Sequence, residues 1–312
     1  LHTGERNGPN ILPRDMVKAF QSRVPESCIV ETNTLYRGDR HTTESHRETL
    51  RVNGWNFCPV DIMDEEGDVA LPVRGGLHLT EVAMGGHLVN YDSMIVLTHF
   101  KGHELTGFGG AIKNIGMGCG SRAGKMAMHC NGKPSVDAEK CRGCRTCTRY
   151  CAQEAISITE HKAHIDHEKC VGCGRCIGVC NFSAIASDID ANSADVNSRM
   201  AEYAKAVVDG RPHFHVSIVN QVSPCCDCHG ENDAAVVPDI GMFAGFDPVA
   251  LDHACIDAVN AAPVIASSVL GQCDHAGHDH FTSIHPVTDW RSQIAHAEAI
   301  GLGNGEYELI RL

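Results

Sequence analysis

Eight of the 17 cysteines fall in two tightly spaced runs. The runs are Cys141-x2-Cys144-x2-Cys147-x3-Cys151 and Cys170-x2-Cys173-x2-Cys176-x3-Cys180. This spacing is typical of iron-sulfur ligands, because a [4Fe-4S] cube needs four soft thiolates at tetrahedral corners. A loop with two-residue gaps supplies three of these thiolates, so the fourth has to come from elsewhere. The sequence therefore predicts two [4Fe-4S] clusters that carry single electrons.

In a two-cluster arrangement the last cysteine of each run binds the cluster of the other run. One predicted cluster is held by Cys141, Cys144, Cys147 and Cys180. The other is held by Cys170, Cys173, Cys176 and Cys151. Zinc is the alternative metal, since it also binds four cysteines, often as two separated CxxC pairs. The tandem spacing favours iron, and clusters that only brace the fold are a second alternative.

The two runs belong to an internal repeat, in which Val136-Asp-Ala-Glu-Lys-Cys141 recurs as Ile165-Asp-His-Glu-Lys-Cys170. Two copies are too few for a solenoid, and they fit a pseudo-twofold mini-domain whose halves pack on each other. The repeat, at about residues 135–190, resembles bacterial ferredoxins. It departs from them at Ala152 and Asn181, where that family usually has proline.

A second candidate site is the glycine-rich segment His99–Gly120, which follows a predicted buried strand at Ser93–Leu97. Strand ends of this kind are where open α/β sheets bind ligands. Glycines permit positive φ and close backbone approach to a ligand, here at Gly107, Gly109, Gly110, Gly116, Gly118 and Gly120. A helix from about Ser121 should direct its N-terminus at an anion. Tight glycine turns with solvated lysines are the alternative interpretation.

Several motifs resemble the family called domain of unknown function 362. They are Gly109-Gly-Ala-Ile-Lys-Asn114, Gly116-Met-Gly-Cys-Gly120, Asp227-Cys-His229, Val237-Pro-Asp-Ile-Gly241, Asp247-Pro-Val-Ala-Leu-Asp252 and the ending Gly301-Leu-Gly303. The resemblance covers nearly the whole chain. It implies a fold context and an inserted two-cluster ferredoxin, which many members carry, but no settled reaction.

Three side chains around this segment could do chemistry: His103, Lys113 and His129. Their spacing is also similar to the core motif of nickel-pincer lactate racemases. That likeness implies Lys113 as the anchor of a nicotinate-derived nucleotide, His129 as a metal ligand and His103 as an acid/base. Independently of nickel, we expect the three to converge on one cleft, where histidine titrates near neutrality and lysine binds an anion.

The segment Cys225-Cys226-Asp-Cys228-His229 follows a predicted strand at Phe214–Val219. At most two of these cysteines could bind a third metal or contact a cluster, because adjacent cysteines chelate one ion poorly. Buried thiols beside a turn aspartate are the alternative interpretation.

The elements that must position these residues alternate between helix and strand. Helices are predicted at Asp15–Val24, Thr43–Val52, Ser193–Val208, Asp247–Ala261 and Thr288–Ile300, and strands at Cys28–Glu31, Ser93–Leu97 and Phe214–Val219. Alternation on both sides of the cysteine window predicts an α/β fold. We expect an open α/β body, residues 1–134 and 191–312, with an inserted α+β bacterial ferredoxin-like two-cluster domain at 135–190.

The net charge of −13 at pH 7 makes nucleic acid an unexpected partner, since phosphate backbones are anionic. No apolar run approaches the roughly 20 residues that span a bilayer. Clustered cysteines indicate metal ligands in a reducing compartment, so we expect a cytoplasmic protein. The expected partners are a small anionic ligand and a redox protein with a basic docking face.

Three functions fit these observations. The first is an iron-sulfur oxidoreductase whose two clusters feed electrons to a substrate or cofactor in the α/β cleft. The second is an electron-carrier subunit of a larger redox complex, with no chemistry of its own. The third is a racemase-like, ligand-binding enzyme with structural clusters. The first is favoured over the second, because a carrier does not need the large body with its glycine, lysine and histidine cleft.

Overall fold

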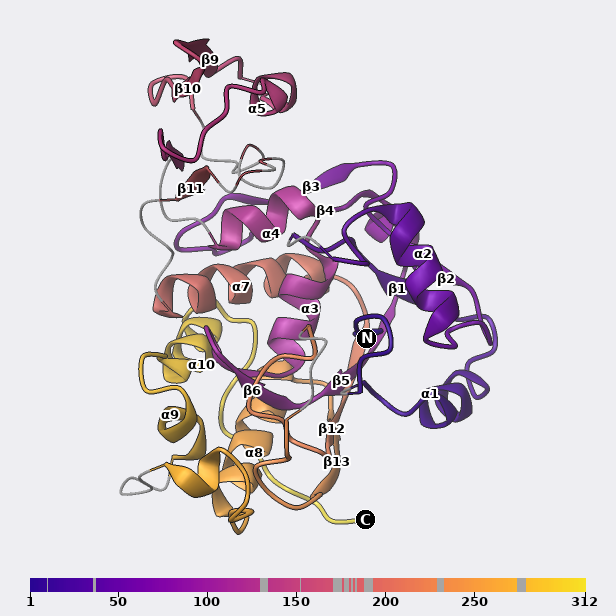
Figure 1. The fold of residues 1–312 in the computed structure, drawn as a ribbon. Helices are drawn as coiled ribbons and strands as arrows, with labels where there is room; N and C mark the ends of the chain where they lie inside the picture. Colours follow the sequence, from indigo (N-terminus) through magenta and orange to yellow (C-terminus); the bar gives the residue numbers. More distant parts are fainter. Residues whose placement is uncertain are drawn as a thin grey trace.

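The computed structural model describes residues 1–9, 11–35, 38–129, 134–151, 153–170, 176, 180, 182, 184–187, 193–228, 233–273 and 279–312. Two parts are distinguished in Figure 1: a large body, and above it a small module that contains the cysteine runs. The body is built from segments before and after the module. This arrangement follows from the position of the module in the middle of the chain.

A three-stranded sheet forms the centre of the body. Its order is β13 (Gly241–Gly245), β12 (His213–Val219) and β5 (Met94–His99). β12 is parallel to β5 and antiparallel to β13. β12 suits the central position because it is rich in β-branched residues, and its last five residues are buried. The parallel pair requires a crossover connection, which here carries the glycine-rich segment and the whole module.

Helices pack around this sheet. They are α3 (Ala111–Cys119), α7 (Ser193–Val208), α8 (Pro248–Ala261) and α10 (Trp290–Ala299). α8 packs against β12 and β13, and α3 packs against β5 and α8, while α7 lies between α3 and α10. Their contacts bury one large apolar core, whose biggest members include Tyr203, Phe100, Phe108 and Phe281.

Local sequence explains where α8 begins. The carboxylate of Asp247 accepts hydrogen bonds from the backbone N–H of Val249 at 2.8 Å and of Ala250 at 3.1 Å. Pro248 occupies the first turn, where the missing N–H has no helical partner to lose. The start at Asp247-Pro248 was predicted for these reasons and is confirmed.

The remaining elements of the body surround the sheet. They are α1 (Arg14–Gln21), β1 (Ile29–Glu31), α2 (Thr43–Val52), β2 (Val60–Ile62), β3 (Asp68–Pro72), β4 (Glu81–Gly85), β6 (Lys101–His103), β7 (Gly107–Gly109), α4 (Arg122–His129), α9 (His280–Ile284) and two 3-10 helices at Gly86–Asn90 and Leu270–Gln272. A second apolar core joins α1, α2 and β1 to the outer side of β5 and β12. The predicted α/β fold is confirmed by this mixture of helices and sheets.

One expectation for the glycine-rich segment is wrong. Gly116 and Gly118 lie inside helix α3, not in a turn, and neither has positive φ. Among the six glycines singled out, only Gly107 has positive φ, at 82°. At Gly116 the reason is tertiary packing, because the absence of a side chain lets α3 approach α7 closely.

Gly116 sets the distance between α3 and α7. A Cβ atom at Gly116 would lie 2.3 Å from the carbonyl oxygen of Met200 in α7. We therefore expect Gly116→Ala to lower the free energy of unfolding by about 1–3 kcal/mol. Gly118→Ala is the control, because a Cβ atom at Gly118 would lie 3.6 Å from its nearest neighbour, Asn114 Oδ1. Gly118→Ala should raise the free energy of unfolding by about 0.5–1 kcal/mol. Chemical denaturation measures both, and equal stability of the two variants would contradict this packing.

The cysteine module consists of short strands that pair across the repeat. They are β8 (Pro134–Val136), β9 (Ile156–Thr159), β10 (Lys162–Ile165) and β11 (Ile185–Ser187). Helix α5 (Thr146–Tyr150) begins after Cys144 and contains Cys147. β8 pairs with β11 and β9 pairs with β10, both antiparallel. The first strand of the module therefore pairs with its last.

The two halves of the repeat make equivalent contacts. The backbone N–H of Asp137 donates to the carbonyl of Ala184 at 2.8 Å, and that of Asp166 donates to the carbonyl of Ala155 at 2.7 Å. Ala184 follows the second cysteine run, and Ala155 follows the first. Each half therefore begins beside the end of the other half.

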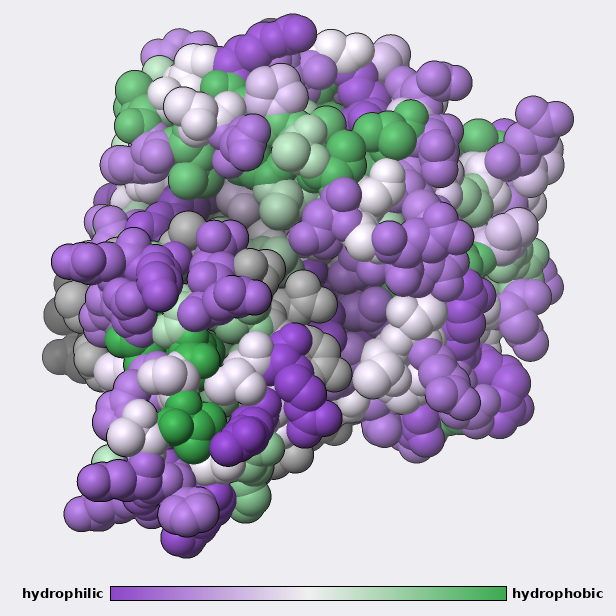
Figure 2. All heavy atoms as spheres, turned by 90° about the horizontal axis from the view of Figure 1, so that it is seen from above, coloured by the Kyte–Doolittle hydropathy of each residue, from purple (hydrophilic) through white to green (hydrophobic). Residues whose placement is uncertain are grey.

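The face seen from above in Figure 2 is mainly hydrophilic, with small hydrophobic groups between. This agrees with a chain of which 21% is charged. Among the described residues, no helix is both long and apolar enough to cross a membrane.

Candidate active-site cavity and cysteine module

A cavity of about 340 Å³ lies at the end of the central sheet. All three side chains that the sequence singles out line it: His103, Lys113 and His129. They come from β6, α3 and the last turn of α4, so the fold brings together side chains of three different elements. The N-terminal residues Leu1 and His2 and the two cysteines Cys226 and Cys228 are also part of the wall.

The candidate glycines divide into two groups. Gly109, Gly110 and Gly118 line the cavity, whereas Gly116 and Gly120 are not among its lining residues. Gly116 faces α7, and a Cβ atom at Gly120 would lie 3.0 Å from the Met128 side chain. At Gly116 and Gly120 the glycine therefore makes room for another part of the protein and not for a ligand.

The N-terminus of α3 is capped from within the protein. The carboxylate of Asp252 accepts hydrogen bonds from the backbone N–H of Ala111 at 2.6 Å and of Ile112 at 3.0 Å. Gly110 makes room for this carboxylate, since a Cβ atom there would lie 2.2 Å from it. α4 begins at Arg122, close to the predicted Ser121, but it contributes Lys125 and His129 to the cavity and not its first residues. A ligand in the cavity therefore meets side chains of α3 and α4.

Lys113 and Cys226 face each other inside the cavity. The Lys113 Nζ atom lies 3.6 Å from the Cys226 Sγ atom. Burial lowers the pKa of the Lys113 ammonium, but the nearby Cys226, Cys228 and Glu104 together outweigh burial and raise the pKa above its ordinary value. Both residues belong to motifs in the sequence, yet they are separated by 113 positions. Only the fold shows that they meet.

His103 lies beside this pair and has a defined tautomer. Its Nδ1 atom accepts hydrogen bonds from the backbone N–H of Leu105 and of Thr106, both at 3.1 Å. The ring proton is therefore on Nε2. Burial, together with the positive charge of Lys113, lowers the pKa of His103, so it stays a neutral donor at pH 7.

Lys125 and His129 also line the cavity, and they differ in charge at pH 7. Lys125 Nζ donates to Thr32 Oγ1, to the carbonyl of Asn33 at 2.9 Å and to the carbonyl of Gly120 at 2.8 Å. Burial lowers the pKa of Lys125 to about 8. Burial and the nearby cations lower the pKa of His129 to about 4. His129 is therefore neutral at pH 7. The hydrogen bonds of Lys125 connect three segments of the cavity wall.

The loop that carries Cys226 and Cys228 is fixed by the aspartate between them. Asp227 Oδ2 lies 2.8 Å from His99 Nδ1 and 2.9 Å from Lys101 Nζ. Although burial raises it, Lys101 and His99 hold the pKa of Asp227 below its usual range. Sequence reasoning missed Lys101 as a site residue. Its place two positions after His99, beyond a predicted strand end, was the available signal.

Substituting this aspartate should loosen the loop. We expect Asp227→Asn to lower the free energy of unfolding by about 3–5 kcal/mol, because it leaves the buried Lys101 ammonium without its counter-charge. The exposed Asp239 is the control, since it accepts one hydrogen bond from the backbone of Gln221. Denaturation curves of Asp227→Asn and Asp239→Asn give the comparison. A loss for Asp227→Asn no larger than for the control would show that the ion group does not stabilise this wall.

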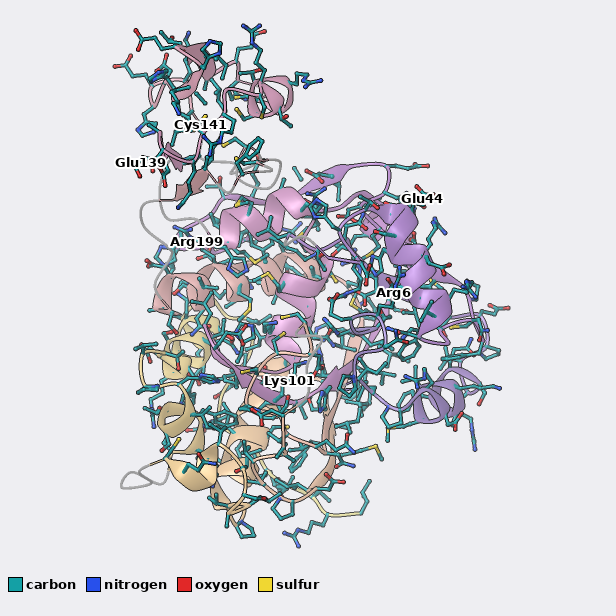
Figure 3. The ribbon with its side chains drawn as sticks, viewed as in Figure 1. Arg6, Glu44, Lys101, Glu139, Cys141 and Arg199 are labelled. Carbon is teal, nitrogen blue, oxygen red and sulfur yellow. The ribbon has the colours of Figure 1, made fainter. Side chains whose placement is uncertain are left out.

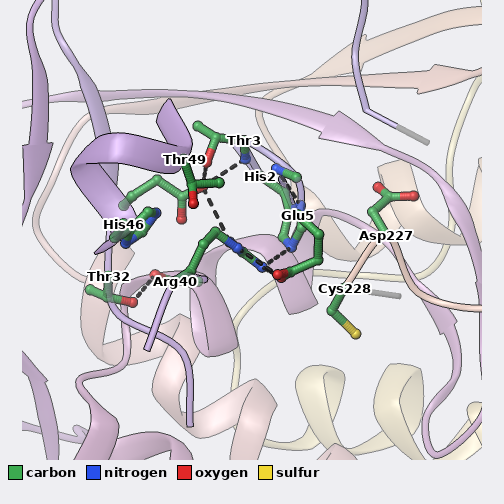
Figure 4. A network of polar contacts seen from close by, with 12 residues as sticks. His2, Thr3, Glu5, Thr32, Arg40, His46, Thr49, Asp227 and Cys228 are labelled. Atoms are coloured by element: carbon green, nitrogen blue, oxygen red, sulfur yellow. Dashed lines mark hydrogen bonds and ion pairs between the residues drawn. The ribbon is translucent and has the colours of Figure 1, made fainter. Parts of the chain in front are cut away.

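The N-terminal segment closes the opposite wall through Arg40. The Arg40 guanidinium contacts Glu5 Oε1 at 2.7 Å, Glu31 Oε1 at 3.8 Å and His2 Nε2 at 3.0 Å. Figure 4 shows Arg40 among these groups, with Asp227 and Cys228 on a separate chain segment beside them. Burial raises the pKa of Glu31, but Arg40 together with His2 and His46 outweighs burial and lowers the pKa to about 2. No local pattern in the sequence indicates this role for Arg40.

One further group of polar side chains is satisfied by the backbone. The ligand atoms of His78, Glu202 and His296 all lie within 4.8 Å of one another. The Glu202 carboxylate accepts hydrogen bonds from three successive backbone N–H groups at 2.8–2.9 Å and contacts His296 Nε2 at 2.9 Å. These contacts tie the segment 77–79 to α7, and they occupy the oxygens that a metal would need.

The cysteines of the module are close together but are not disulfide-bonded among the described residues. One hollow in the module is lined by Cys141, Cys144, Cys147 and Cys180. From the second run, Cys170, Cys176 and Cys180 are described, while Cys173 lies outside the described residues. The last cysteine of the second run therefore stands beside the first three cysteines of the first run.

Backbone N–H groups point at the cysteine sulfurs. The N–H of Ala163 donates to Cys141 Sγ, and the N–H of Ala184 donates to Cys180 Sγ, both at 3.3 Å. The N–H of Ala155 makes the same contact with Cys151 at 3.3 Å. Such donors stabilise negative charge on sulfur.

The candidate third metal site does not assemble in the described part of the chain. Cys226 and Cys228 lie together, but the nearest cation to Cys226 is the Lys113 ammonium, and a third ligand atom is not grouped with them. Cys225 is not among the residues that line the cavity. His229 lies outside the described residues.

Comparison with known proteins identifies a family for this chain. The family model for a domain of unknown function, DUF362, matches residues 9–257. The match includes the central sheet strands β5, β12 and β13, the cavity residues other than Leu1 and His2, and the cysteine module. No curated protein matches the chain. Since the matched region is most of the 312 residues, this chain belongs to the DUF362 family.

Proposed function

We propose that this protein is an iron-sulfur oxidoreductase that passes single electrons through two [4Fe-4S] clusters to a small anionic substrate in the cavity. The observation that carries the proposal is the position of Cys180 beside Cys141, Cys144 and Cys147 around one hollow. Four thiolates from two different runs are the donor set that a cubane takes in a two-cluster module.

The packing of the module also supports bound clusters. Its core contains Cys141, Cys147 and Cys176 among only a few aliphatic side chains. A domain of about 50 residues rarely buries enough apolar surface to be stable without a metal or disulfides. Described cysteines are free of disulfides, and their sulfurs accept backbone N–H bonds. Bound clusters would supply the missing stability and the electron carrier together.

The charge of the cavity argues for an anionic substrate. Four cationic side chains line it, namely Arg40, Lys101, Lys113 and Lys125, against the carboxylates of Glu31 and Glu104. Arg40 and Lys101 are paired with carboxylates, and Lys125 donates to three protein oxygens. Lys113 is the cation that a substrate carboxylate or phosphate would contact, with His103 Nε2–H as a second donor.

The proposal includes a route for electrons from the cysteine module to the cavity in the body. Figure 3 places Cys141 in the module and Lys101 at the centre of the body. Helix α4 is the body helix beneath the module in Figure 1, and its last residue, His129, lines the cavity. We assign the passage of electrons to the side of the body on which α4 lies. A carrier without its own chemistry would not need this enclosed, charged cavity.

The direct test is a single-turnover experiment with the full chain. Small molecules released by denaturing the anaerobically purified protein are identified by mass, and each anion is mixed with dithionite-reduced protein. The proposal predicts that one of them reoxidises the clusters in the wild type and not in Lys113→Met. Clusters that exchange electrons with a redox protein but with none of these anions would favour the carrier function instead.

A further inference from the structure

Two thiols in the cavity have no role in the proposed function so far. Cys226 and Cys228 both line the cavity, and Cys226 is buried, with 3% of its surface exposed. The backbone N–H of Cys228 donates to Cys226 Sγ at 3.4 Å. The two cysteines are therefore in contact on one wall of the cavity.

The surroundings favour a thiolate on one of the two cysteines. Lys113 Nζ lies 3.6 Å from Cys226 Sγ, and His103 also hydrogen-bonds this sulfur. The contact with Cys228 lowers the pKa of Cys226 most. Burial raises this pKa, but Lys113 and His103 lower it further, so the net shift is downward. The pKa of Cys228 is raised, by its hydrogen bond to Cys226 and by burial. The pair therefore has one nucleophilic sulfur and one protonated partner.

The geometry points to a redox role. We propose that Cys226 and Cys228 form a dithiol/disulfide couple that reduces a small anionic disulfide bound beside Lys113. Their place on the cavity wall, their mutual contact and the adjoining ammonium carry this proposal. Redox pairing also explains why a cation adjoins Cys226, where a metal site would place a third ligand.

The reaction balances as two thiol-disulfide exchanges. The Cys226 thiolate attacks one sulfur of the substrate disulfide, forming a mixed disulfide and releasing the other half as a thiolate. Cys228 then gives up its proton to that thiolate and attacks Cys226, which releases the second half as a thiolate. The products are two substrate thiols, after uptake of one further proton, and the Cys226–Cys228 disulfide.

Regeneration of the dithiol rests on the proposed function. The disulfide takes up two electrons and one proton to return to the Cys226 thiolate and the Cys228 thiol. Each [4Fe-4S] cluster delivers one electron at a time, so a pair of clusters matches a two-electron couple. The couple itself can be reduced by dithiothreitol, so it is testable without the clusters.

The test uses 5,5′-dithiobis(2-nitrobenzoate), an anionic disulfide, on the reduced full chain under anaerobic conditions. Peptide mapping by mass spectrometry then reports the state of each cysteine. We expect one equivalent to give the Cys226–Cys228 disulfide in the wild type. Cys228→Ser should instead trap thionitrobenzoate on Cys226, and Cys226→Ser should lower the rate of modification in this loop at least about tenfold. Cys225→Ser is the matched control and should behave as the wild type.

Two outcomes would overturn the inference: a wild type without the Cys226–Cys228 disulfide, or a Cys226→Ser variant that reacts in this loop as fast as the wild type. Iron is measured on the same samples, which separates the two proposals. A protein without clusters that still forms the disulfide refutes the proposed function and keeps the couple. A protein with both clusters and no disulfide refutes the Cys226–Cys228 couple and keeps the proposed function.

Discussion

Replacing Cys180 with alanine is expected to remove about half of the bound iron, from about eight to about four atoms per chain. The reason is that Cys180 lies with Cys141, Cys144 and Cys147 around one hollow, so the cluster of the first run loses a ligand. The cluster of the second run keeps its ligands. Iron and sulfide analysis of anaerobically purified protein measures the loss, and the reduced variant should give the EPR signal of one isolated cluster.

Two further variants make this result specific. Cys151→Ala should remove the other cluster and give the complementary EPR signal. Cys58→Ala is the control, because Cys58 packs in the apolar core of the body and far along the chain from the module. Full iron in Cys180→Ala would refute the crossed assignment of ligands.

Replacing Lys113 with methionine is expected to weaken binding of the anionic substrate about 10- to 100-fold. Methionine keeps most of the volume but removes the cation, and hydrogen bonds to charged groups contribute about 1.5–3 kcal/mol. The same change removes the charge 3.6 Å from Cys226 Sγ, so the pKa of the Cys226 thiol should rise towards its ordinary value. The iron content should not change.

Isothermal titration with the anion identified from the purified protein measures the affinity, and the rate of iodoacetamide labelling against pH measures the Cys226 pKa. The groups that face Cys226 are Lys113, His103, Glu104 and Cys228. Lys205→Met is the control, because this lysine is on the surface and donates to the carbonyl of Gly301. Unchanged affinity and labelling in Lys113→Met would place the substrate elsewhere.

Elements with local signals could be predicted from the sequence. Helix α2 has the predicted ends Thr43 and Val52, because Thr42 and Ser45 form a capping box at its start. Helix α8 begins at an aspartate cap followed by proline. The internal repeat likewise predicts two packed halves, and the equivalent contacts of Asp137 and Asp166 follow it.

Features that depend on distant residues could not be predicted. Gly116 and Gly118 favour a turn by composition, but Gly116 is required in a helix because α7 packs against it. Asp252 caps α3 from 141 positions away, and Cys226 meets Lys113 across 113 positions. No periodicity or spacing encodes such contacts, because they arise only when the parallel strands β5 and β12 bring both segments to one edge.

The central claim is that the cysteine module holds two redox-active clusters, and metal analysis tests it most directly. The protein is purified anaerobically, and iron, sulfide and zinc are measured per chain together with its visible absorbance before and after dithionite. We predict a brown protein with about eight iron and eight sulfide per chain that is bleached by dithionite. A colourless protein that contains zinc, or no metal, would contradict the account.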